Sequence, residues 1–399
     1  MAIHTPREEL CRIPRLGDIQ YGKAHTEEEL QAQRAVGDPL ADDAIGELRR
    51  VHPIRSPDDM LTEVRRLAAE GGDNVYTRFL EETSRVPAWA DFRRMERGQR
   101  LLAIHGPFMG LSLLTGSLVG GYMFKKMAMV TAITGRLGMP GDISRRLKET
   151  SALVFSMALP GELQPGGRAH EILVRVRLLH GAIRQWMADS GRWKADWDTP
   201  INQEDLSITL SLFSCWNIQS LLRMGVRLSD EDIESHHLVW RYAGHVLGIQ
   251  ETLLTEHFDA EVVQYREMLK HQARPAECPP YGKKILDEVA SKVPLLPESV
   301  SREFLYQTTR YLIGDELVSG LEIEPRRGYP GIAVLKLAGR AASALRSLPG
   351  GDELLFRFGA RSYKRELARM ASKKRLSYGV KTHSVESVRR AHGLATVSA

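Results

Sequence analysis

The chain has 399 residues, 43% of them hydrophobic, and a formal net charge of +5. It is long enough to bury a large core, either as two or three domains or as one large helical domain. Three widely separated cysteines, with no CxxC or Cys/His zinc spacing, argue against a disulfide scaffold and a zinc site and favour a reducing, cytoplasmic setting. No basic segment followed by an apolar one opens the chain, so we expect no secretory signal.

Residues 1–36 read as a polar N-terminal arm. After it, helices are predicted where capping residues precede apolar residues at helical spacing. In chain order these helices are 41–51, 56–69, 73–82, 87–102, 107–132, 142–159 and 171–190. Gly71-Gly72 ends the second of them and Gly191 ends the last. A turn is predicted at 135–141.

The rest of the chain continues the helical pattern. The predicted helices are 202–224, 229–247, 259–273, 282–293, 297–313, 332–348 and 352–370, with loops at 275–280 and 325–330. Few runs alternate with a period of two, and no nucleotide-binding glycine loop follows a strand. The sequence therefore predicts an all-α protein, with one large helical domain at 37–350 and a basic C-terminal helix and tail at 351–399.

One uncharged segment, Leu101 to Phe124, has nearly the length of a membrane span. Gly106-Pro107 interrupts it, and further glycines and hydroxyl residues dilute its apolar character. We therefore favour a buried core helix over a membrane span.

His180 is the residue with the clearest chemical context. It lies in a helical run with Leu173, Val176 and Ile183 around it, and Gly181 leaves space beside the ring. A dry wall with room beside an imidazole suits an axial iron ligand. A single histidine on an apolar face is more often a satisfied core residue, so the pattern alone favours the structural interpretation.

The order of several motifs resembles the latex-clearing-protein (rubber oxygenase) family, which includes proteins similar to the oxygenase of the mycophenolic-acid pathway. The central pattern is Arg146, then Thr150, then His180 within Arg-x-x-His thirty residues later. Other matching motifs, within roughly 37–255, are Val86–Asp91, Arg94, Arg97–Gln99, Pro200–Asp205 and Arg241–Gly248.

This resemblance implies a globin-like helical core around haem b, with His180 as the iron ligand. On the opposite side, Arg146 would orient acids and Thr150 would offer a hydroxyl group. The site residues implied are Arg146, Thr150, Lys148 and Glu149 for catalysis, and His180, Arg177, Arg184 and Arg146 for haem binding.

Two positions depart from the family pattern. The rubber oxygenases carry a lysine directly before the threonine, whereas this chain has Glu149 there and Lys148 one place earlier. They also use a glutamate of the preceding helix as a base, and no acid occurs between Met123 and Gly135. These departures, and the absence of the secretion signal of latex-degrading relatives, predict a different substrate or a different base.

The resulting hypothesis is a cytoplasmic haem b-dependent oxidoreductase, an oxygenase that acts on an apolar small molecule with dioxygen or peroxide. The alternative is a non-catalytic haem-binding or membrane-peripheral helical protein. A di-iron site is a minor reading, because such a site uses two ExxH pairs and the histidines at 236, 237, 245 and 257 supply one, Glu234 with His237. Cys215 lacks the signature of a haem thiolate, and Asn202 to Asp205 reads as a helix cap that would also shape the pocket.

The basic charge is concentrated near the C-terminal end, where residues 357–390 contain eleven Lys and Arg against two Glu. Without interleaved aromatic residues this segment does not predict a nucleic-acid partner. A solvated face is the default, and contact with an anionic membrane surface is the alternative.

Overall fold

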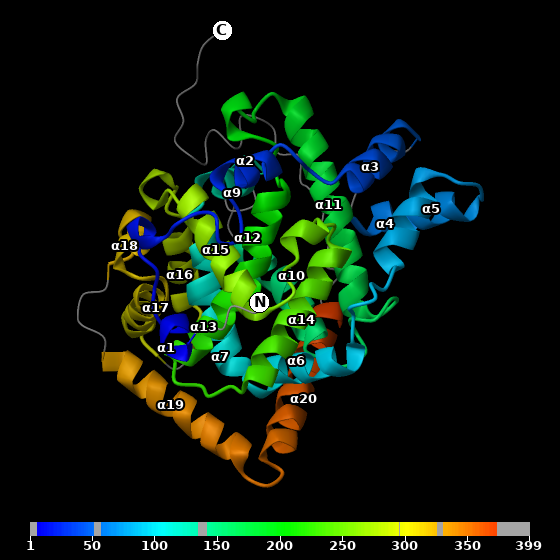
Figure 1. Cartoon of the computed structure of the whole chain (residues 1–399). Helices are drawn as coiled ribbons and strands as arrows, with labels where there is room; N and C mark the ends of the chain where they lie inside the picture. The colour runs from blue at the N-terminus through cyan, green and yellow to red at the C-terminus, as the bar shows by residue number, and fades with distance from the viewer. Residues whose placement is uncertain (1–5, 52–56, 135–141, 295, 325–329, 373–399) are drawn as a thin grey trace.

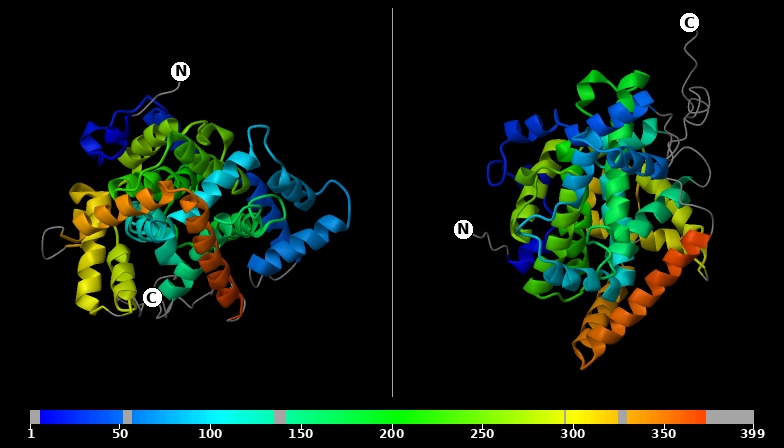
Figure 2. Two further views of the ribbon diagram at one scale, coloured as in Figure 1. Left: turned by 90° about the horizontal axis from the view of Figure 1, so that it is seen from below. Right: turned by 90° about the vertical axis from the view of Figure 1, so that its right-hand side faces the viewer.

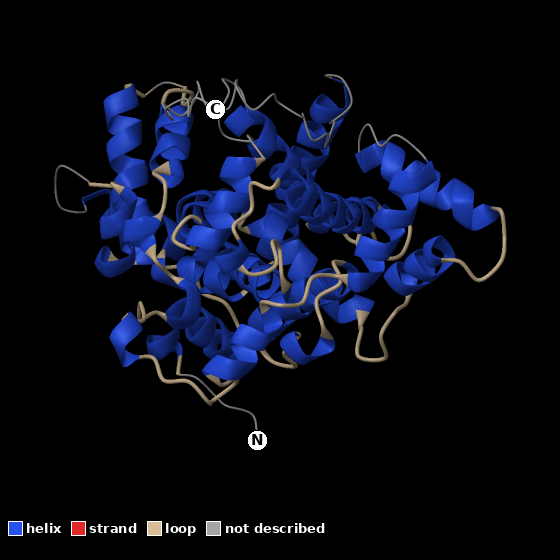
Figure 3. Ribbon diagram, turned by 90° about the horizontal axis from the view of Figure 1, so that it is seen from above, coloured by secondary structure: helices blue, strands red, loops and turns tan. Residues whose placement is uncertain are grey.

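The computed structural model describes residues 6–51, 57–134, 142–294, 296–324 and 330–372, and every regular element in these ranges is a helix (Figure 3). The predicted turn at 135–141, nearly all of the predicted loop at 325–330 and the tail from 373 on lie outside the described residues. Phe124 and Ala273 form one isolated bridge. The prediction of an all-α fold is confirmed.

The helices pack around one main core, and the N-terminal helices are spread over its outside, the first two to the left of centre in Figure 1 and the next three at the right (Figures 1 and 2). The first helices are α1 (Arg7–Leu10), α2 (Glu27–Gln33), α3 (Pro39–Val51), α4 (Pro57–Ala69), α5 (Val75–Ser84), α6 (Phe92–Ile104), α7 (Gly106–Ser112), α8 (Val119–Gly121), α9 (Lys125–Ile133) and α10 (Asp142–Met157). They are followed by α11 (Arg168–Ser190), α12 (Gln203–Phe213), α13 (Cys215–Arg223), α14 (Asp230–Val246) and α15 (Phe258–Gln272). The last are α16 (Tyr281–Ala290), α17 (Glu298–Ile313), α18 (Asp315–Val318), α19 (Pro330–Ser347) and α20 (Gly351–Ser372).

Short turns of other helix types join these elements. One is a π-helix, η2 (Leu113–Leu118), and the others are 3-10 turns: η1 (Leu16–Asp18), η3 (Ala195–Trp197), η4 (Glu251–Leu253), η5 (Pro275–Glu277) and η6 (Ser319–Leu321).

Local capping fixes several helix starts as the sequence predicts. Ser229 and Asp232 form a reciprocal capping box at the start of α14. The side chain of Asn202 accepts a hydrogen bond from the backbone N–H of Asp205 at 2.9 Å and so caps α12. Gly191 ends α11 in the left-handed conformation.

Two predicted long helices are broken, and both predictions were wrong in that respect. The run 107–132 divides into α7, η2, α8 and α9, and the run 202–224 divides at Ser214 into α12 and α13. Apolar residues predominate in both runs and no proline lies inside either, so the hydrophobic pattern contains no clear signal for the break.

The central helices approach each other closely. A side chain at Gly98 on α6 would meet the backbone oxygen of Ser235 on α14 at 2.3 Å. Within the described ranges, no single helix has the length and apolar character needed to cross a membrane, although α6 with residues 106–121, bent by 84°, passes that test as a pair.

The N-terminal arm is tied to this body by buried polar contacts. The carboxylate of Glu267 on α15 accepts hydrogen bonds from the backbone N–H groups of Lys23, Ala24 and His25. Arg34, at the end of the arm, is completely buried.

Candidate functional site

A cavity of about 580 Å³ lies inside the helical body. Its walls come mainly from η2, α9, α10, α11 and α12, with one or two residues each from α7, α8, α14, α16 and α20. Most of the lining side chains are apolar, and the volume falls within the range of pockets for small molecules and cofactors.

Helix α11 forms one wall of this cavity. Val176, Leu179, His180 and Ile183 face it, and at 100° per residue these positions lie on one side of the helix. His180 stands at the edge of this stripe and is half-buried. Its imidazole therefore faces an apolar space.

The neighbouring face of α11 packs against α3 instead. Arg177 donates two hydrogen bonds to the carboxylate of Asp38, at 2.7 and 3.0 Å. Arg184 donates to Asp42 at 2.7 Å and to the carbonyl of Ile201 at 3.1 Å. Neither arginine lines the cavity.

These contacts differ from the sequence-based expectation for both arginines, which was to hold haem propionates. As their spacing predicted, both arginines lie near His180 on α11. Each is rotated by 40–60° around the helix axis from His180, and this rotation directs its side chain toward α3 instead of the cavity. Their aspartate partners lie about 140 residues earlier in the chain, so the sequence around position 180 does not indicate these ion pairs.

Gly181 also has a different role from the predicted one. A side chain at this position would meet the backbone of Ala41 on α3 at 3.1 Å, and Gly181 does not line the cavity. The glycine lets α3 approach α11 and does not make room beside the imidazole.

Helix α10 forms a second wall. Arg146, Glu149 and Thr150 all line the cavity, whereas Lys148 is exposed and does not. The structure thus places Lys148 outside the site to which the sequence analysis assigned it. Glu149, directly before Thr150, is the acid that α10 contributes to the cavity wall. Arg145 approaches Glu149 only to 3.9 Å.

The charge of Arg146 is directed into the cavity. Its Nη1 lies 3.5 Å from the hydroxyl of Thr131 on α9, which also lines the cavity. Among the described lining residues Arg146 is the one cation, so it is the group placed to receive an anionic substituent of a ligand.

The π-helix η2 supplies a further part of the wall. Leu113, Leu114, Ser117 and Leu118 from its single wide turn line the cavity. Extra residues of this kind inside a helix frequently occur at functional sites because they change the direction of the side chains. Sequence reasoning missed this feature, although the glycines of the run drew attention to the segment.

Asp205 brings a second acid to the cavity wall, and sequence reasoning weighed it mainly as a cap residue. Its Oδ1 accepts a hydrogen bond from Arg34 at 2.9 Å, and its Oδ2 accepts one from Asn202 at 3.0 Å. Burial raises the pKa of this carboxyl, while Arg34 acts in the opposite direction. Asp205 is thus an acid held in a fixed position.

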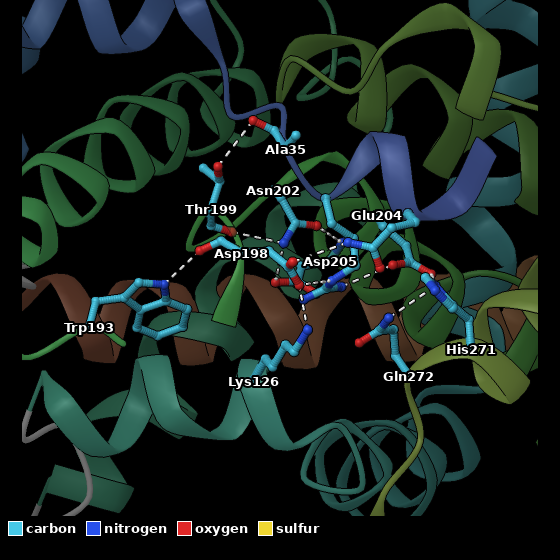
Figure 4. A network of polar contacts seen from close by, with 12 residues as sticks. Ala35, Lys126, Trp193, Asp198, Thr199, Asn202, Glu204, Asp205, His271 and Gln272 are labelled. Carbon is cyan, nitrogen blue, oxygen red and sulfur yellow. Dashed lines mark hydrogen bonds and ion pairs between the residues drawn. The ribbon is translucent and has the colours of Figure 1, made fainter. Parts of the chain in front are cut away.

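Figure 4 shows the polar network behind Asp205. The buried guanidinium of Arg34 donates to Asp198 at 2.6 Å and to Glu204 at 2.9 Å, and Lys126 from α9 also pairs with Asp198. His271 bonds the other side of Glu204 at 2.8 Å. Three carboxylates therefore pair with the buried guanidinium of Arg34. These pairs hold the N-terminal arm against α12, where Asp205 lines the cavity.

Two of the histidines on α14 are paired with acids outside the cavity lining. His237 bonds Glu261 at 2.8 Å, and His245 bonds Glu251 at 3.1 Å. Across the described part of the chain, no three His, Cys, Asp or Glu side chains are grouped to hold a metal ion. Cys215 is buried against the carbonyl of Ser211, away from the cavity lining.

The cavity residues fit an iron porphyrin by their chemistry. His180 offers one imidazole, Arg146 offers a cation on another wall, and Thr150 offers a hydroxyl group beside it. The surrounding wall is apolar, as a porphyrin face requires. Arg177 and Arg184 would not take part, because each is already paired with an aspartate.

Comparison with known proteins gives three findings. The profile of the family described as "ER-bound oxygenase mpaB/B'/Rubber oxygenase, catalytic domain" matches residues 102–344. The rubber oxygenase of Streptomyces sp. (strain K30) is 23% identical over 252 residues, which are 62% of this chain and 60% of the relative. A structure of latex clearing protein LCP in the closed state aligns with a TM-score of 0.62 at 19% identity, covering 84% of this chain and 91% of the other.

Proposed function

Because this chain belongs to the family of mpaB/B'-type and rubber oxygenase catalytic domains, we propose that it is a haem b-dependent oxygenase acting on an apolar small molecule. The observation that carries the proposal is one imidazole, that of His180, at the edge of an apolar cavity of about 580 Å³. The prediction of the family from the motif order is confirmed.

Haem b, when bound, supplies an iron centre that activates dioxygen or peroxide. His180 would hold the iron through its ring nitrogen, and Arg146 would neutralise a propionate by hydrogen bonds to its carboxylate. The hydroxyl of Thr150 lies one helical turn from Arg146 and can donate a hydrogen bond to an oxygen atom of the oxidant or substrate.

Proton transfer needs an acid or base in the same cavity, and the chain offers two carboxyl groups there. Glu149 lies on α10 beside Thr150, and Asp205 lies on α12. Glu149 stands directly before Thr150, where the rubber oxygenases carry a lysine, and we assign it the role of proton donor or acceptor. Asp205 is held by Arg34 and Asn202 and is better suited to orienting a polar group of the substrate.

The substrate class follows from the lining. Most of the wall consists of leucine, valine, isoleucine and phenylalanine side chains. The transfer of an apolar molecule from water into this cavity would therefore be favourable. The names of the matched proteins refer to rubber and latex, and the chain spans about 60% of the length of the rubber oxygenase. We propose a small molecule for this chain because haem b would itself fill much of the cavity of about 580 Å³ and leave room for a small substrate only.

Absorbance and turnover test the proposal together. Freshly purified protein should show a Soret band that survives gel filtration, and it should consume an added apolar alkene only when dioxygen or peroxide is present. A persistent band with no loss of any apolar substrate would favour the non-catalytic haem-binding alternative. A colourless protein that stays colourless after addition of haemin would contradict the proposal.

A further inference from the structure

Exposed apolar side chains are concentrated at one place on the described surface, the hairpin formed by α19 and α20. Ten large hydrophobic residues are exposed in the described ranges, and six of them belong to this hairpin. These six are Val334, Leu337, Leu345, Leu348, Leu354 and Phe358, with exposures from 42% to 78%. Figures 1 and 2 show the two helices as a V at one edge of the body.

The exposed residues of α19 form a continuous stripe. Val334, Leu337, Ala341, Leu345 and Leu348 recur every three or four positions and lie within about 80° of one another around the helix axis. A helix on a protein surface normally turns charged residues outward at these positions. An unbroken apolar stripe of this kind marks a surface that another apolar phase covers.

The other side of α19 already faces the body. Gly339 lies against the backbone of Met224, where a side chain would come within 2.2 Å of the carbonyl oxygen, and Ile332 and Leu335 are buried. The stripe is therefore an additional apolar surface, separate from the one that holds the helix to the fold.

Helix α20, the second helix of the hairpin, carries an apolar face of its own that becomes basic along the helix. Leu354, Phe358, Arg361 and Arg365 follow each other at spacings of four, three and four, so they lie on one face of the helix. All four are exposed. Two apolar side chains thus lead directly into two cations on the same face.

Three of the cations on α20 are available to a partner. Arg357 is paired with Glu353 at 2.7 Å, but Arg361, Lys364 and Arg365 form no ion pair with any residue that the structure describes. The combination of an apolar stripe and adjoining unpaired cations is the pattern of helices that lie in the interface of an anionic bilayer.

We propose that the α19–α20 hairpin docks the protein on the surface of an anionic lipid bilayer. The apolar side chains from Val334 to Phe358 enter the boundary between headgroups and acyl chains, and Arg361, Lys364 and Arg365 contact the phosphate groups. A second copy of the chain fits this face less well, because a two-fold contact would bring the basic surfaces of α20 together.

This docking goes beyond the proposed oxygenase activity and does not depend on it. Apolar molecules partition into bilayers, so a hairpin that holds the protein there would place the cavity near a reservoir of apolar compounds. Vesicle binding is measurable without haem or turnover, so either proposal can fail while the other stands.

The test is co-sedimentation of the full chain with vesicles of phosphatidylcholine alone and of phosphatidylcholine with phosphatidylserine. We expect binding to the anionic vesicles that weakens as sodium chloride is raised. Replacing two cations in R361E/R365E should weaken binding by about 25-fold or more, at about fivefold for each cation. Replacing two apolar residues in L337S/F358S should weaken it by at least about tenfold.

The matched control is Val300→Ser, since Val300 is a 50% exposed residue of α17 outside the hairpin. Its binding should equal that of the wild type, and all variants should unfold at the wild-type temperature because their side chains are exposed. Equal binding to neutral and anionic vesicles, or unchanged binding of both double variants, would overturn the proposal. A dimer that Leu337→Ser disperses without affecting vesicle binding would instead identify the face as an interface between copies.

Discussion

The two faces of α11 use similar polar residues for different purposes. On one face His180 lines an apolar cavity, and across from it Arg146 of α10 points into the same space. On the other face Arg177 is paired with Asp38, directly before α3, and Arg184 is paired with Asp42 of α3. A rotation of about 40–60° around the helix separates a group that can meet a ligand from a group committed to the fold.

The comparison teaches that a charge serves a ligand only where the fold has left it without a carboxylate partner. Arg146 has a hydroxyl neighbour and a cavity in front of it, whereas Arg177 has a bidentate partner at 2.7 and 3.0 Å. Changes on the α3 face should therefore alter stability, and changes on the cavity face should alter ligand binding.

Arg177→Ala should have the largest effect on stability. Removing one member of a buried, hydrogen-bonded pair leaves Asp38 charged and buried, which costs about 3–5 kcal/mol of unfolding free energy. Urea denaturation followed by circular dichroism measures this loss. Arg168→Ala, an exposed position on the same helix, is the control and should change the free energy by less than about 0.5 kcal/mol. Equal stability of the two variants would contradict the assignment of Arg177 to the fold.

A histidine sealed in the core should make stability fall in acid. Burial lowers the pKa of His105 to about 4 from 6.5, and neither ring nitrogen has a hydrogen-bond partner among the described residues. Between pH 6.5 and 4 the unfolded chain binds this proton and the folded protein does not, so folding weakens as the pH falls, by about 3 kcal/mol for one histidine.

The measurement is the urea midpoint at several pH values between 7 and 4. His105→Leu should flatten the dependence in this window, because the variant has no imidazole to protonate in the unfolded state. His180→Leu, at the cavity, provides the matched histidine deletion. An unchanged slope in His105→Leu would show that other groups dominate the acid response.

Arg146→Ala should weaken haemin binding by about tenfold, which is the loss of one charged hydrogen bond of about 1.5 kcal/mol. Its unfolding free energy should stay within about 0.5 kcal/mol of the wild type, since no carboxylate is left unpaired. Arg184→Ala should give the reverse, with reduced stability and unchanged haemin affinity. Haemin titration and urea denaturation of both variants measure these effects. If both variants lost haemin affinity and stability to the same extent, the assignment of Arg146 to the cavity and of Arg184 to the fold would be contradicted.

Lys148→Ala should have the smallest effect. The side chain is exposed and does not line the cavity, so haemin affinity, turnover and stability should all remain at the wild-type level. Glu149→Gln, one residue later and in the cavity wall, should leave haemin binding in place and alter the dependence of turnover on pH. A strong loss of turnover in Lys148→Ala would reverse the assignment of the two residues.

Much of the fold was predictable because it is encoded locally. Capping residues such as Ser229 and stop signals such as Gly191 act within one helical turn, so the ends of α14 and α11 could be found from neighbouring residues. The π-turn at 113–118 and the break at Ser214 depend on how distant helices pack against runs that are mostly apolar.

The candidate site was predictable in part for the same reason. His180, Arg146 and Thr150 were identified from the motif order, and all three line one cavity. The partners of Arg177 and Arg184 lie 139 and 142 residues away in sequence, which no local pattern reveals. Choosing between Lys148 and Glu149 needed the rotation of α10, because adjacent residues on a helix point 100° apart.

Haem content of His180→Ala is the most direct test of the central claim that this imidazole holds the cofactor. The Soret absorbance per mole of protein should fall to less than about a tenth of the wild-type value, because no other described histidine lines the cavity. Free imidazole should restore part of the absorbance by occupying the space of the missing ring. Full haem content in the purified variant, with an unshifted Soret band, would contradict the account.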